Sequence, residues 1–457
     1  MADFTALTID NPNELIFGSA PNPVTTRRGM HIGGGEVYPE LNFTLPSIEV
    51  CTETLGEITA MYRTVVDEVC KRAVELHVPG LVIEFETLIE MTLQPEYAIE
   101  LTKVMNDVLE SYFVRHQLKS ALRITPNDTR DKNRPPLMRE SELLDKMLYT
   151  FEHCARNGAE MLSIESTGGK EVHDDALVEC NIEKVIFGLA VLGVRDMQYL
   201  WQRIVRIAEQ TGAPAAGDTA CGFANTAMVL AEKKFIPAVF AAVVRAATIA
   251  RSLVAFECGA VGPGKDCGYE NPFLKAITGL PMSMEGKTAA CAHLSPLGNI
   301  AAACCDLWSN ESIQNIKLLG GMAPTIYLEQ LAYDCRLMNQ STRDGQQRQL
   351  RDMFVRSDAA LDPQALILAP KNVVRIAAAT IAQPDHYRRT VVAAKEALAI
   401  IREAHEANAV LLAEMDVPWL EMLAASLAAL PGSADAFIES QLPMLDTTKF
   451  RAQDYGL

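Results

Sequence analysis

Residues 80–125 read GLVIEFETLIEMTLQPEYAIELTKVMNDVLESYFVRHQLKSALRIT, and they decide the fold class. The segment opens with a short apolar run, GLVIEFE (80–86), and closes with another, SALRIT (120–125). Both runs have the length and composition of buried strands, and the residues between them can form a helix. Alternation of strands with helices favours a parallel sheet.

The same alternation continues along the chain. Further predicted strands are EMLSIES (160–166), VIFGLAVLG (185–193), APAAGDT (213–219), SLVAFEC (252–258), PMSME (281–285) and MAPTIYL (322–328). Eight strand–helix units within roughly 250 to 270 residues have the size of a (β/α)8 TIM barrel. An open doubly wound sheet is the alternative, but no G-x-G-x-x-G opens a strand–helix–strand unit. We therefore expect an α/β fold: a (β/α)8 TIM barrel with an N-terminal arm and additional C-terminal helices.

Composition divides the chain into three expected parts. Residues 1–50 are rich in Gly, Pro and Asn and are predicted to form an irregular N-terminal arm, in which the glycines at 33–35 make a structural turn. Residues 51–340 hold the predicted barrel. Residues 341–457 shift to Ala, Leu, Arg and Glu, which indicates helices packed on the barrel or at a subunit contact.

Charge and cysteine content exclude several classes of protein. The 457 residues carry a net charge of −17, and no Lys/Arg stripe stands out, which argues against nucleic-acid binding. Eleven cysteines, an odd number, do not resemble a disulfide framework. The start, MADFTALTIDNPNE, lacks a secretory pattern, and no run approaches ~20 uninterrupted apolar residues, so we expect no membrane span. These features predict a reduced, cytoplasmic protein.

Three good metal ligands follow predicted strands. Glu165 ends EMLSIES, Cys221 follows APAAGDTA, and Cys267 lies in the loop after SLVAFEC. In a parallel barrel the loops after the strands converge at one end, so these three side chains are expected in one mouth. One carboxylate and two thiolates suit zinc, with a fourth position left for substrate. A single cysteine is more often a buried apolar side chain, and it is the coincidence of three strand ends that favours a metal.

Other polar residues near the predicted strand ends leave more than one reading open. Asp218, Glu257, Asp266 and Glu285 can each orient a ligand or relay a proton, but a salt-bridge role at the rim of the barrel explains them equally well. The segment GAVGPGK (259–265) imitates a phosphate loop. It fails as one because Asp266 replaces the required Ser/Thr and the proline removes an amide donor.

A nucleophilic Cys/His pair is a further reading of the cysteines. It would need a partner such as His173 or His293, and the sequence places neither beside a thiol. Exposed loop histidines are the simpler interpretation.

Several long segments resemble one known family. LSIESTGGKE (162–171), AGDTACGFANTAM (216–228), RSLVAFECGAVGPGKDCGYEN (251–271), AITGLPMSMEGKTAACAH (276–293) and CCDLWSNES (304–312) are similar to the methanol:corrinoid methyltransferase (MtaB) family. The similarity is dense from about residue 158 to 312 and looser toward both ends, including the C-terminal DYGL.

The resemblance implies a (β/α)8 barrel with a catalytic zinc held by one Glu and two Cys, which fall on Glu165, Cys221 and Cys267. It also implies a small corrinoid-carrying partner protein whose cobalt(I) accepts the methyl group of methanol. Zinc would polarise the methanol oxygen, and an acid that protonates this oxygen would accelerate its departure.

Two further sets of residues are assigned roles on this basis. The acid candidates are Asp218, Glu257 and Asp266. The glycines that would let a corrinoid approach the metal closely, unless they serve only as tight turns, are Gly168, Gly169, Gly262, Gly264 and Gly268.

Two alternatives to methanol transfer stay open. The first keeps the chemistry and changes the methyl donor, for example to a methoxylated aromatic compound. The second is a non-catalytic barrel that only docks a corrinoid protein, and the presence of all three candidate ligands argues against it. In either case we expect an oligomer with itself and with the corrinoid protein.

Overall fold

A computed structural model describes residues 2–44, 48–286, 296–313, 317–318 and 321–457. Its main sheet has seven parallel strands in the order β7-β6-β5-β4-β3-β9-β8. The strands of the described residues are β1 (Ser19–Thr25), β2 (His31–Gly34), β3 (Tyr38–Thr44), β4 (Gly80–Glu86), β5 (Lys119–Thr125), β6 (Met161–Ile164), β7 (Ala215–Asp218), β8 (Ser283–Glu285), β9 (Leu307–Ile313), β10 (Lys317–Leu318) and β11 (Gly321–Met322). Outside the main sheet, β1 pairs with β2 and β10 pairs with β11, each pair antiparallel. The expected α/β class, built on a parallel sheet, is therefore confirmed.

Helices follow most of these strands. They are α1 (Leu55–Glu75), α2 (Ile89–Leu93), α3 (Pro95–His116), α4 (Glu142–Arg156), α5 (Lys170–Val178), α6 (Ile182–Ile186), α7 (Val194–Thr211), α8 (Thr226–Glu232), α9 (Ala238–Ala247), α10 (Ile249–Glu257), α11 (Asn271–Thr278), α12 (Ala323–Arg343), α13 (Gln347–Asp358), α14 (Pro363–Leu368), α15 (Pro370–Ile381), α16 (His386–Glu406), α17 (Val417–Ala429) and α18 (Ala434–Gln441). Two π-helices, η2 (Phe187–Gly193) and η3 (Cys221–Asn225), continue into α7 and α8.

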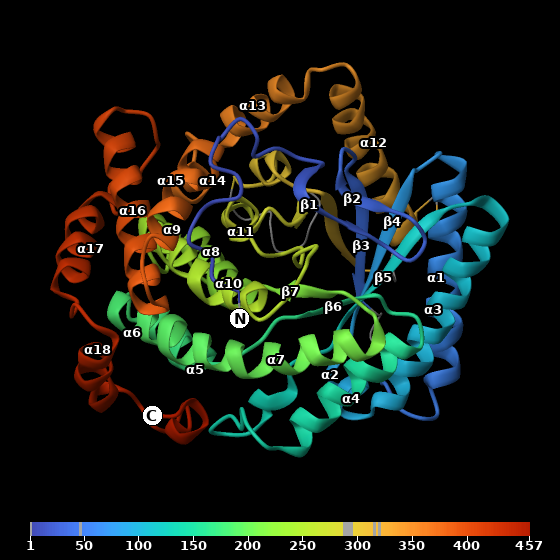
Figure 1. The fold of residues 1–457 in the computed structure, drawn as a ribbon, viewed down its shortest axis with the longest axis horizontal. Coiled ribbons are helices and arrows are strands. Elements are labelled where there is room, and N and C mark those ends of the chain that lie inside the picture. Colours follow the sequence, from blue (N-terminus) through green and yellow to red (C-terminus); the bar gives the residue numbers. More distant parts are fainter. Residues whose placement is uncertain (1, 45–47, 287–295, 314–316, 319–320) are drawn as a thin grey trace.

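The sheet is curled, and helices surround its outer side. In Figure 1, α1, α3, α4 and α7 follow one another around β3 to β7. Contacts between neighbours extend this arc through α12 before α1 and through α10 and α11 after α7. Helices α1, α3, α4 and α7 each bury one apolar stripe, as amphipathic helices on a parallel sheet do, whereas α10 and α11 are buried along their whole length.

The inner face of the sheet encloses a separate core. An apolar cluster lies toward the N-terminal ends of the strands: Met30, Ile32, Tyr38, Val82, Ala121, Met161, Ala216 and Leu307. Met30 and Ile32 belong to the segment of the β1–β2 hairpin, which therefore closes this end. Further toward the C-terminal ends of the strands, the inner face of the sheet is charged, because Arg123 of β5 forms a fully buried ion pair with Glu40 of β3 at 2.6 Å.

A non-regular segment lies between the two edge strands β7 and β8. The amide of Val261 donates to the Ala215 carbonyl at 2.8 Å, on the β7 side. On the β8 side, Ser283 donates to the Gly264 carbonyl at 3.1 Å, and Gly264 forms an isolated parallel bridge with Met282. Residues 261–266 thus occupy the gap that the seven strands leave.

Three predicted strands are wrong. VIFGLAVLG (185–193) lies in α6 and the π-helix η2, SLVAFEC (252–258) lies mainly in α10, and MAPTIYL (322–328) opens α12. The first two are buried throughout their helical parts, so their apolar runs carry no helical periodicity that would distinguish them from strands. In the third, Pro324 occupies the first turn of the helix, where proline is tolerated.

The predicted irregular arm contains a central strand. Tyr38–Thr44 forms β3, which pairs with β4 on one side and β9 on the other. The residues before it form the β1–β2 hairpin. The expectation of an irregular arm over all of residues 1–50 is wrong for these segments, and β9 was likewise not predicted.

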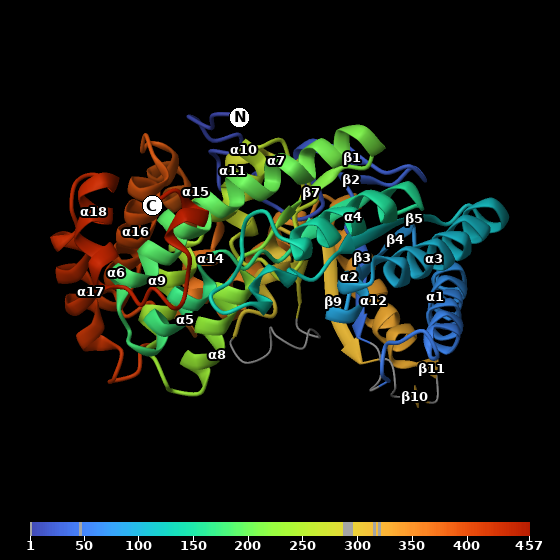
Figure 2. The same cartoon turned by 90° about the horizontal axis from the view of Figure 1, so that it is seen from below.

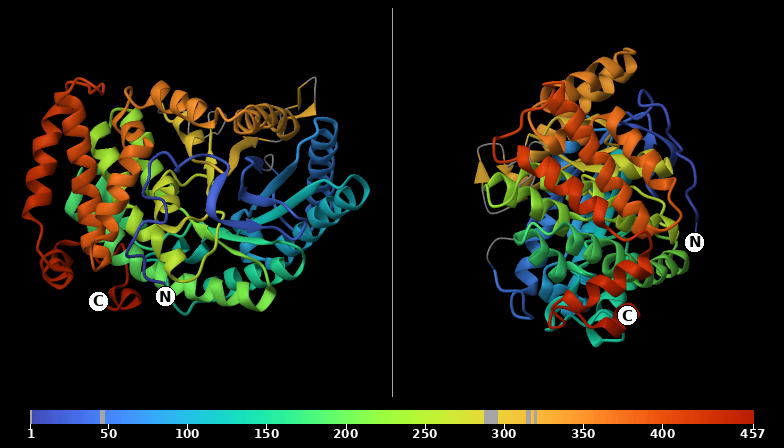
Figure 3. Two further views of the ribbon diagram at one scale, coloured as in Figure 1. Left: turned by 45° about the horizontal axis from the view of Figure 1, so that its top comes forward. Right: turned by 90° about the vertical axis from the view of Figure 1, so that its left-hand side faces the viewer.

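The C-terminal helices gather at one end of the molecule. Figures 2 and 3 show α16, α17 and α18 beside α6 and α9, away from α1 and α3. Helix α16 packs on α9, α10 and α15. Residues 341–457 are thus mainly helical, while the division of the chain into three domains stays a prediction.

Among the described residues, one helical stretch has the length and composition of a membrane span. It is Ala238–Glu257, covering α9 and α10, and it is buried throughout its length inside the protein.

Candidate metal centre

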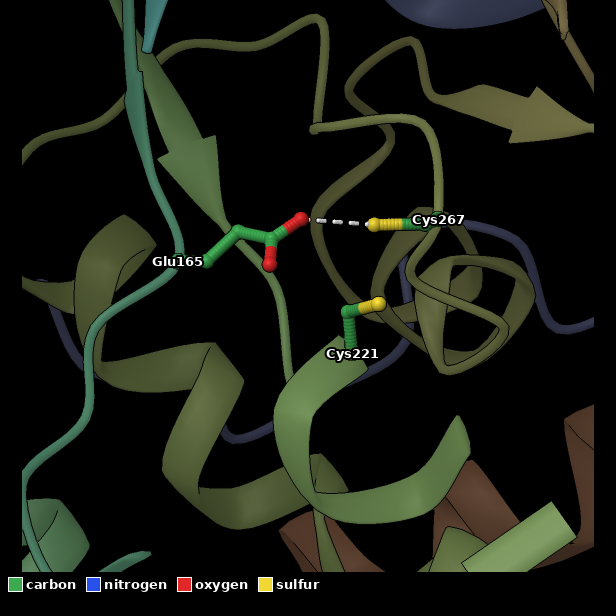
Figure 4. A group of neighbouring side chains, drawn as sticks. All are labelled: Glu165, Cys221 and Cys267. Atoms are coloured by element: carbon green, nitrogen blue, oxygen red, sulfur yellow. Dashed lines mark hydrogen bonds between the residues drawn. The ribbon is translucent and has the colours of Figure 1, made fainter. Parts of the chain in front are cut away.

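The structure brings together the three residues that the sequence singled out as ligands. Glu165 follows β6, Cys221 is the first residue of η3 after β7, and Cys267 follows the segment 261–266. Their candidate ligand atoms all lie within 4.8 Å of one another. Figure 4 shows the three side chains pointing toward a common centre, with the Cys267 thiol donating to Glu165 Oε1 at 2.9 Å.

One amide holds both cysteines in place. Asn225 lies one turn after Cys221 in η3, and its Nδ2 contacts the Cys221 sulfur at 3.4 Å and the Cys267 carbonyl at 3.0 Å. Arg245 of α9 in turn donates to Asn225 Oδ1 at 3.2 Å. A π-helix at this position is consistent with a functional site, because π-helical segments are frequently found at such sites.

A buried lysine neutralises part of the negative charge of the group. Lys265 is 1% exposed, and its Nζ lies 3.2 Å from Glu165 Oε1 and 3.9 Å from the Cys267 sulfur. The same Nζ also contacts Glu84 at 3.0 Å and Asp266 at 2.9 Å. Burial opposes the charged form, but these surrounding anions raise the pKa of Lys265 well above its ordinary value.

Asp218 supports the turn that carries Glu165. It is fully buried, and its carboxylate accepts hydrogen bonds from Trp201 at 2.9 Å and from the amide of Ser166 at 3.3 Å. Arg251 lies 3.5 Å away and opposes the effect of burial, which nevertheless raises the pKa of Asp218. Asp218 therefore acts on the backbone beside Glu165.

Asp266 supports Cys267 in a similar way. Its Oδ1 accepts from the amide of Cys267 at 2.8 Å, and its Oδ2 accepts from Ser309 at 2.8 Å. Burial acts to raise the pKa of Asp266, but Lys265 and the hydrogen bonds lower it below its ordinary value. Both oxygens of this carboxylate are occupied by donors.

Glu257 binds to a different part of the molecule. It ends α10, and its carboxylate pairs with Arg389 at 2.6 Å and His386 at 2.7 Å, both on α16. Burial acts to raise the pKa of Glu257, but His386 and Arg389 lower it. The salt-bridge interpretation accounts for this residue, whose carboxylate pairs with two cationic side chains of α16.

The five glycines assigned to corrinoid approach are packed against this chain itself. A Cβ at Gly168 would lie 2.3 Å from Asp196, and one at Gly169 would lie 2.6 Å from the Gly188 carbonyl. At Gly264 and Gly268 it would meet Met282 at 2.5 Å and Thr219 at 2.8 Å. Gly262 adopts a φ of +78°, with the Pro281 carbonyl 3.0 Å away. Internal packing accounts for all five, so contact with a corrinoid is not needed to explain them.

The Cys/His reading gains no support from His173. Its ring is buried in α5 and packs edge-on against Phe223, with ring centroids 5.0 Å apart. It is not the exposed loop histidine that the sequence indicated. The other candidate, His293, lies outside the described residues.

The sequence reasoning missed a cavity of about 310 Å³ at the C-terminal strand ends. Its polar lining comes from four strands or strand ends: Asn42, Glu86, Asn127 and Glu311. Burial, together with the charges of Glu165 and Asp266, raises the pKa of Glu86 to about 7, while Lys265 and Asn42 act to lower it. None of the three candidate metal ligands lines this cavity, although the charge of Glu165 acts on Glu86. The signal that could have found Glu86 is the pair of acidic residues, two apart, at the end of the apolar run GLVIEFE.

Comparison with known proteins gives matches over the whole chain. A family model described as methanol-cobalamin methyltransferase B subunit matches residues 1–456. A methanol–corrinoid protein co-methyltransferase from Methanosarcina barkeri is 38% identical over 460 residues, covering 99% of each chain. The crystal structure of the methanol:cobalamin methyltransferase complex MtaBC from Methanosarcina barkeri matches with a TM-score of 0.95 and 37% identity, over 100% of both chains.

Proposed function

The chain belongs to the methanol-cobalamin methyltransferase B subunit family, and we propose that it transfers the methyl group of methanol to cobalt(I) of a corrinoid carried on a partner protein. The full-length identity to a co-methyltransferase supports the reaction. The likeness to a chain solved within a methyltransferase complex supports a corrinoid-protein partner. We also propose that the chain associates with copies of itself.

The observation that carries the proposal is the convergence of Glu165, Cys221 and Cys267. Two sulfurs and a carboxylate oxygen from three distant segments are the ligand types of a catalytic zinc, which keeps one further position for substrate. The residues therefore fit zinc, and we assign it to these three side chains. When bound, zinc supplies Lewis-acid polarisation of the methanol oxygen and stabilises the negative charge on that oxygen as the C–O bond breaks.

The surrounding residues prepare this centre for the reaction. Asn225 and the carboxylate of Asp266 fix the two cysteines, and Asp218 fixes the backbone after Glu165. Lys265 offsets one unit of negative charge beside Glu165. Such outer partners orient ligands and tune the metal that they hold.

We further propose that residues 261–266 complete a (β/α)8 barrel. They hydrogen-bond to β7 on one side and to β8 on the other, so they take the place of the missing strand. This irregular position carries Lys265 and Asp266 and leads directly to Cys267. Because residues 261–266 do not form a regular strand, we expect Lys265 and Asp266 to face the C-terminal end of the sheet.

A cytoplasmic location fits the cysteines. All ten of the described cysteines are free thiols, as expected in a reducing compartment. Cys221 and Cys267 require the reduced form to bind metal.

The decisive experiment measures zinc content and methyl transfer together. Wild type should contain about one zinc per chain, by the ligand count of a single site, and should methylate a cobalt(I) corrinoid protein with methanol. Cys221→Ala should lose both the zinc and the activity. Cys258→Ala removes another half-buried free thiol and serves as the matched control, with both properties retained.

A panel of methoxylated aromatic compounds tests the alternative methyl donors. The cavity is lined by two amides and two carboxyl groups together with apolar side chains such as Phe43, Leu88 and Ile89, so the panel itself decides between methanol and a bulkier donor. If the enzyme turns over methoxyarenes but not methanol, the methyl donor is a methoxylated aromatic compound. Full activity in a zinc-free chain would contradict the assignment of the metal. Binding of the corrinoid protein without any turnover would favour a docking role.

A further inference from the structure

The cavity at the C-terminal strand ends is lined by acidic and amide side chains together with apolar ones. Asn42 on β3 pairs in register with Glu84 on β4 and with Glu311 on β9. Side chains two residues apart on a strand share a face, so Glu86 follows Glu84 on the inner face, roughly 7 Å nearer the mouth. Glu84 contacts Lys265, which contacts Glu165. On β4, Glu84 is thus the inward-facing residue that is linked through Lys265 to Glu165, and Glu86 is the next inward-facing residue toward the mouth.

Among the described residues, the hydrogen bond recorded for the Glu86 carboxyl group involves one of its two oxygens. Asn42 Nδ2 donates to Oε2 at 2.8 Å, the hydrogen bond that fixes the side chain against β3. Glu86 is half-buried and lines the cavity. By contrast, Asp218 and Asp266 each receive donors on both carboxylate oxygens and face the backbone beside the ligands.

Burial, more than the charges around it, raises the pKa of Glu86, so that a fraction of these carboxyl groups is protonated near neutral pH. Burial is the largest cause of its raised pKa of about 7, and Glu165 and Asp266 act in the same direction. Lys265 opposes them. The titratable groups that face it from neighbouring elements are Tyr62, Glu165, Lys265, Asp266 and Glu311. A general acid works best when its pKa lies near the operating pH.

We propose that Glu86 is the acid that protonates the departing oxygen of methanol, an inference that rests on the proposed function. The methyl carbon forms its bond to cobalt with the electron pair of cobalt(I), which becomes formally cobalt(III). The C–O bond breaks and its pair stays on oxygen. The proton of Glu86 joins that oxygen, water leaves, and the Glu86 carboxylate regains a proton from solvent.

Glu86→Gln tests this role because it keeps the size of the side chain and removes the acidic proton. In the zinc-loaded enzyme with its cobalt(I) corrinoid protein, we expect kcat to fall by roughly 10²- to 10⁴-fold, the usual effect of a general acid. Wild-type activity should decline as pH rises through the pKa of Glu86, since the acid must be protonated. The variant should lack this decline while retaining its zinc.

The matched control is Glu160→Gln. Glu160 is also a buried carboxyl group with a raised pKa, caused mainly by burial, but it precedes β6 at the opposite end of the sheet and accepts from the amide of Arg27. It should keep the wild-type pH profile. An independent readout is the infrared signal of a protonated carboxyl group in zinc-loaded wild type, which should titrate near neutral pH and be absent in Glu86→Gln alone.

The outcomes separate this inference from the proposed function. Wild type that fails to turn over methanol contradicts both. An active wild type with an unchanged rate and pH profile in Glu86→Gln contradicts only the assignment of the acid. So does loss of zinc in that variant, or disappearance of the alkaline decline in Glu311→Gln instead.

Discussion

Lys265 is a charged side chain enclosed by three carboxylates and a thiol. Its contacts with Glu84, Glu165 and Asp266 lie between 2.9 and 3.2 Å. Burial and the charge of Asp266 raise the pKa of Glu84 well above its ordinary value, so Glu84 does not count as a full negative charge. The charge of Lys265 is balanced mainly by Asp266 and Glu165.

Replacing this lysine should destabilise the chain strongly. Lys265→Met leaves the buried carboxylates without their cation, and breaking a buried ion pair costs about 3–5 kcal/mol. Urea unfolding of the metal-free protein measures the change. Lys146→Met removes an exposed lysine that pairs with Glu142, and it should cost at most about 1 kcal/mol. Equal stabilities of the two variants would contradict this reading of Lys265.

At the residue scale the sequence indicated the three candidate ligands and two carboxyl groups beside them, Asp218 and Asp266, but not Lys265. Glu165, Cys221 and Cys267 could be predicted because each follows an apolar run in a small-residue loop. Glu86 had a weak signal, the acidic pair Glu84 and Glu86 at the end of an apolar run, but the sequence does not tell which face of a strand points inward. Lys265 had none beyond a segment that imitates a phosphate loop, because its partners Glu84 and Glu165 are distant in sequence.

Among the elements, the turn after β6 is held from three directions. Thr167 donates to Asp128, Ser166 donates to Asp218, and the amide of Gly169 donates to the hydroxyl of Tyr455 at 3.2 Å. Gly169 itself adopts a φ of +84° at the start of α5. This left-handed conformation lets the chain turn sharply after Glu165.

Gly169→Ala should be costly for two reasons. Its Cβ would lie 2.6 Å from the Gly188 carbonyl, and the positive φ disfavours any side chain. Together strain and overpacking predict a loss of roughly 2 to 5 kcal/mol. Gly212→Ala is the matched control, since Gly212 has a φ of +73° but no atom within 4 Å of its Cβ. It should lose only about 1–2 kcal/mol in the same urea titration, and a loss as large as that of Gly169→Ala would show that packing is not the cause.

The wrong strand predictions have a common physical origin. Helix α10 and the π-helix η2 are buried on all sides. Helix α10 packs between β7 and α16, and η2 packs among other helices, so neither sequence has the polar face that would reveal a helical period. Strand β3 shows the reverse pattern. Its inward residues Glu40 and Asn42 are polar because the space enclosed by the sheet is charged. Pro39 also argues against a strand in the sequence, because proline is rare within central strands.

Over the whole molecule, the two ends of the chain are hydrogen-bonded to different places. The amide of Ala2 donates to the Glu257 carbonyl at 2.7 Å, and Thr8 binds to the end of α11. At the other end, Asp454 accepts from the amide of Met138 at 2.9 Å, and Arg195 donates to the Tyr455 carbonyl at 2.8 Å. The sequence indicated that the C-terminal region is helical, but contacts over such long separations leave no local pattern.

The last six residues should therefore stabilise the metal centre from a distance. Deletion of 452–457 removes the contacts of Tyr455 with Gly169 and Arg195 and exposes its buried pocket, at a cost of at least about 2 kcal/mol. Thermal unfolding should shift to lower temperature, and zinc should dissociate faster, because the turn after Glu165 loses one of its three supports. Tyr455→Phe isolates the hydrogen bond to Gly169 and should cost about 1 kcal/mol while retaining the packing. If the truncated chain kept both its melting temperature and its zinc, the C-terminal segment would be a passive tail, and the turn would be fixed by Asp128 and Asp218 alone.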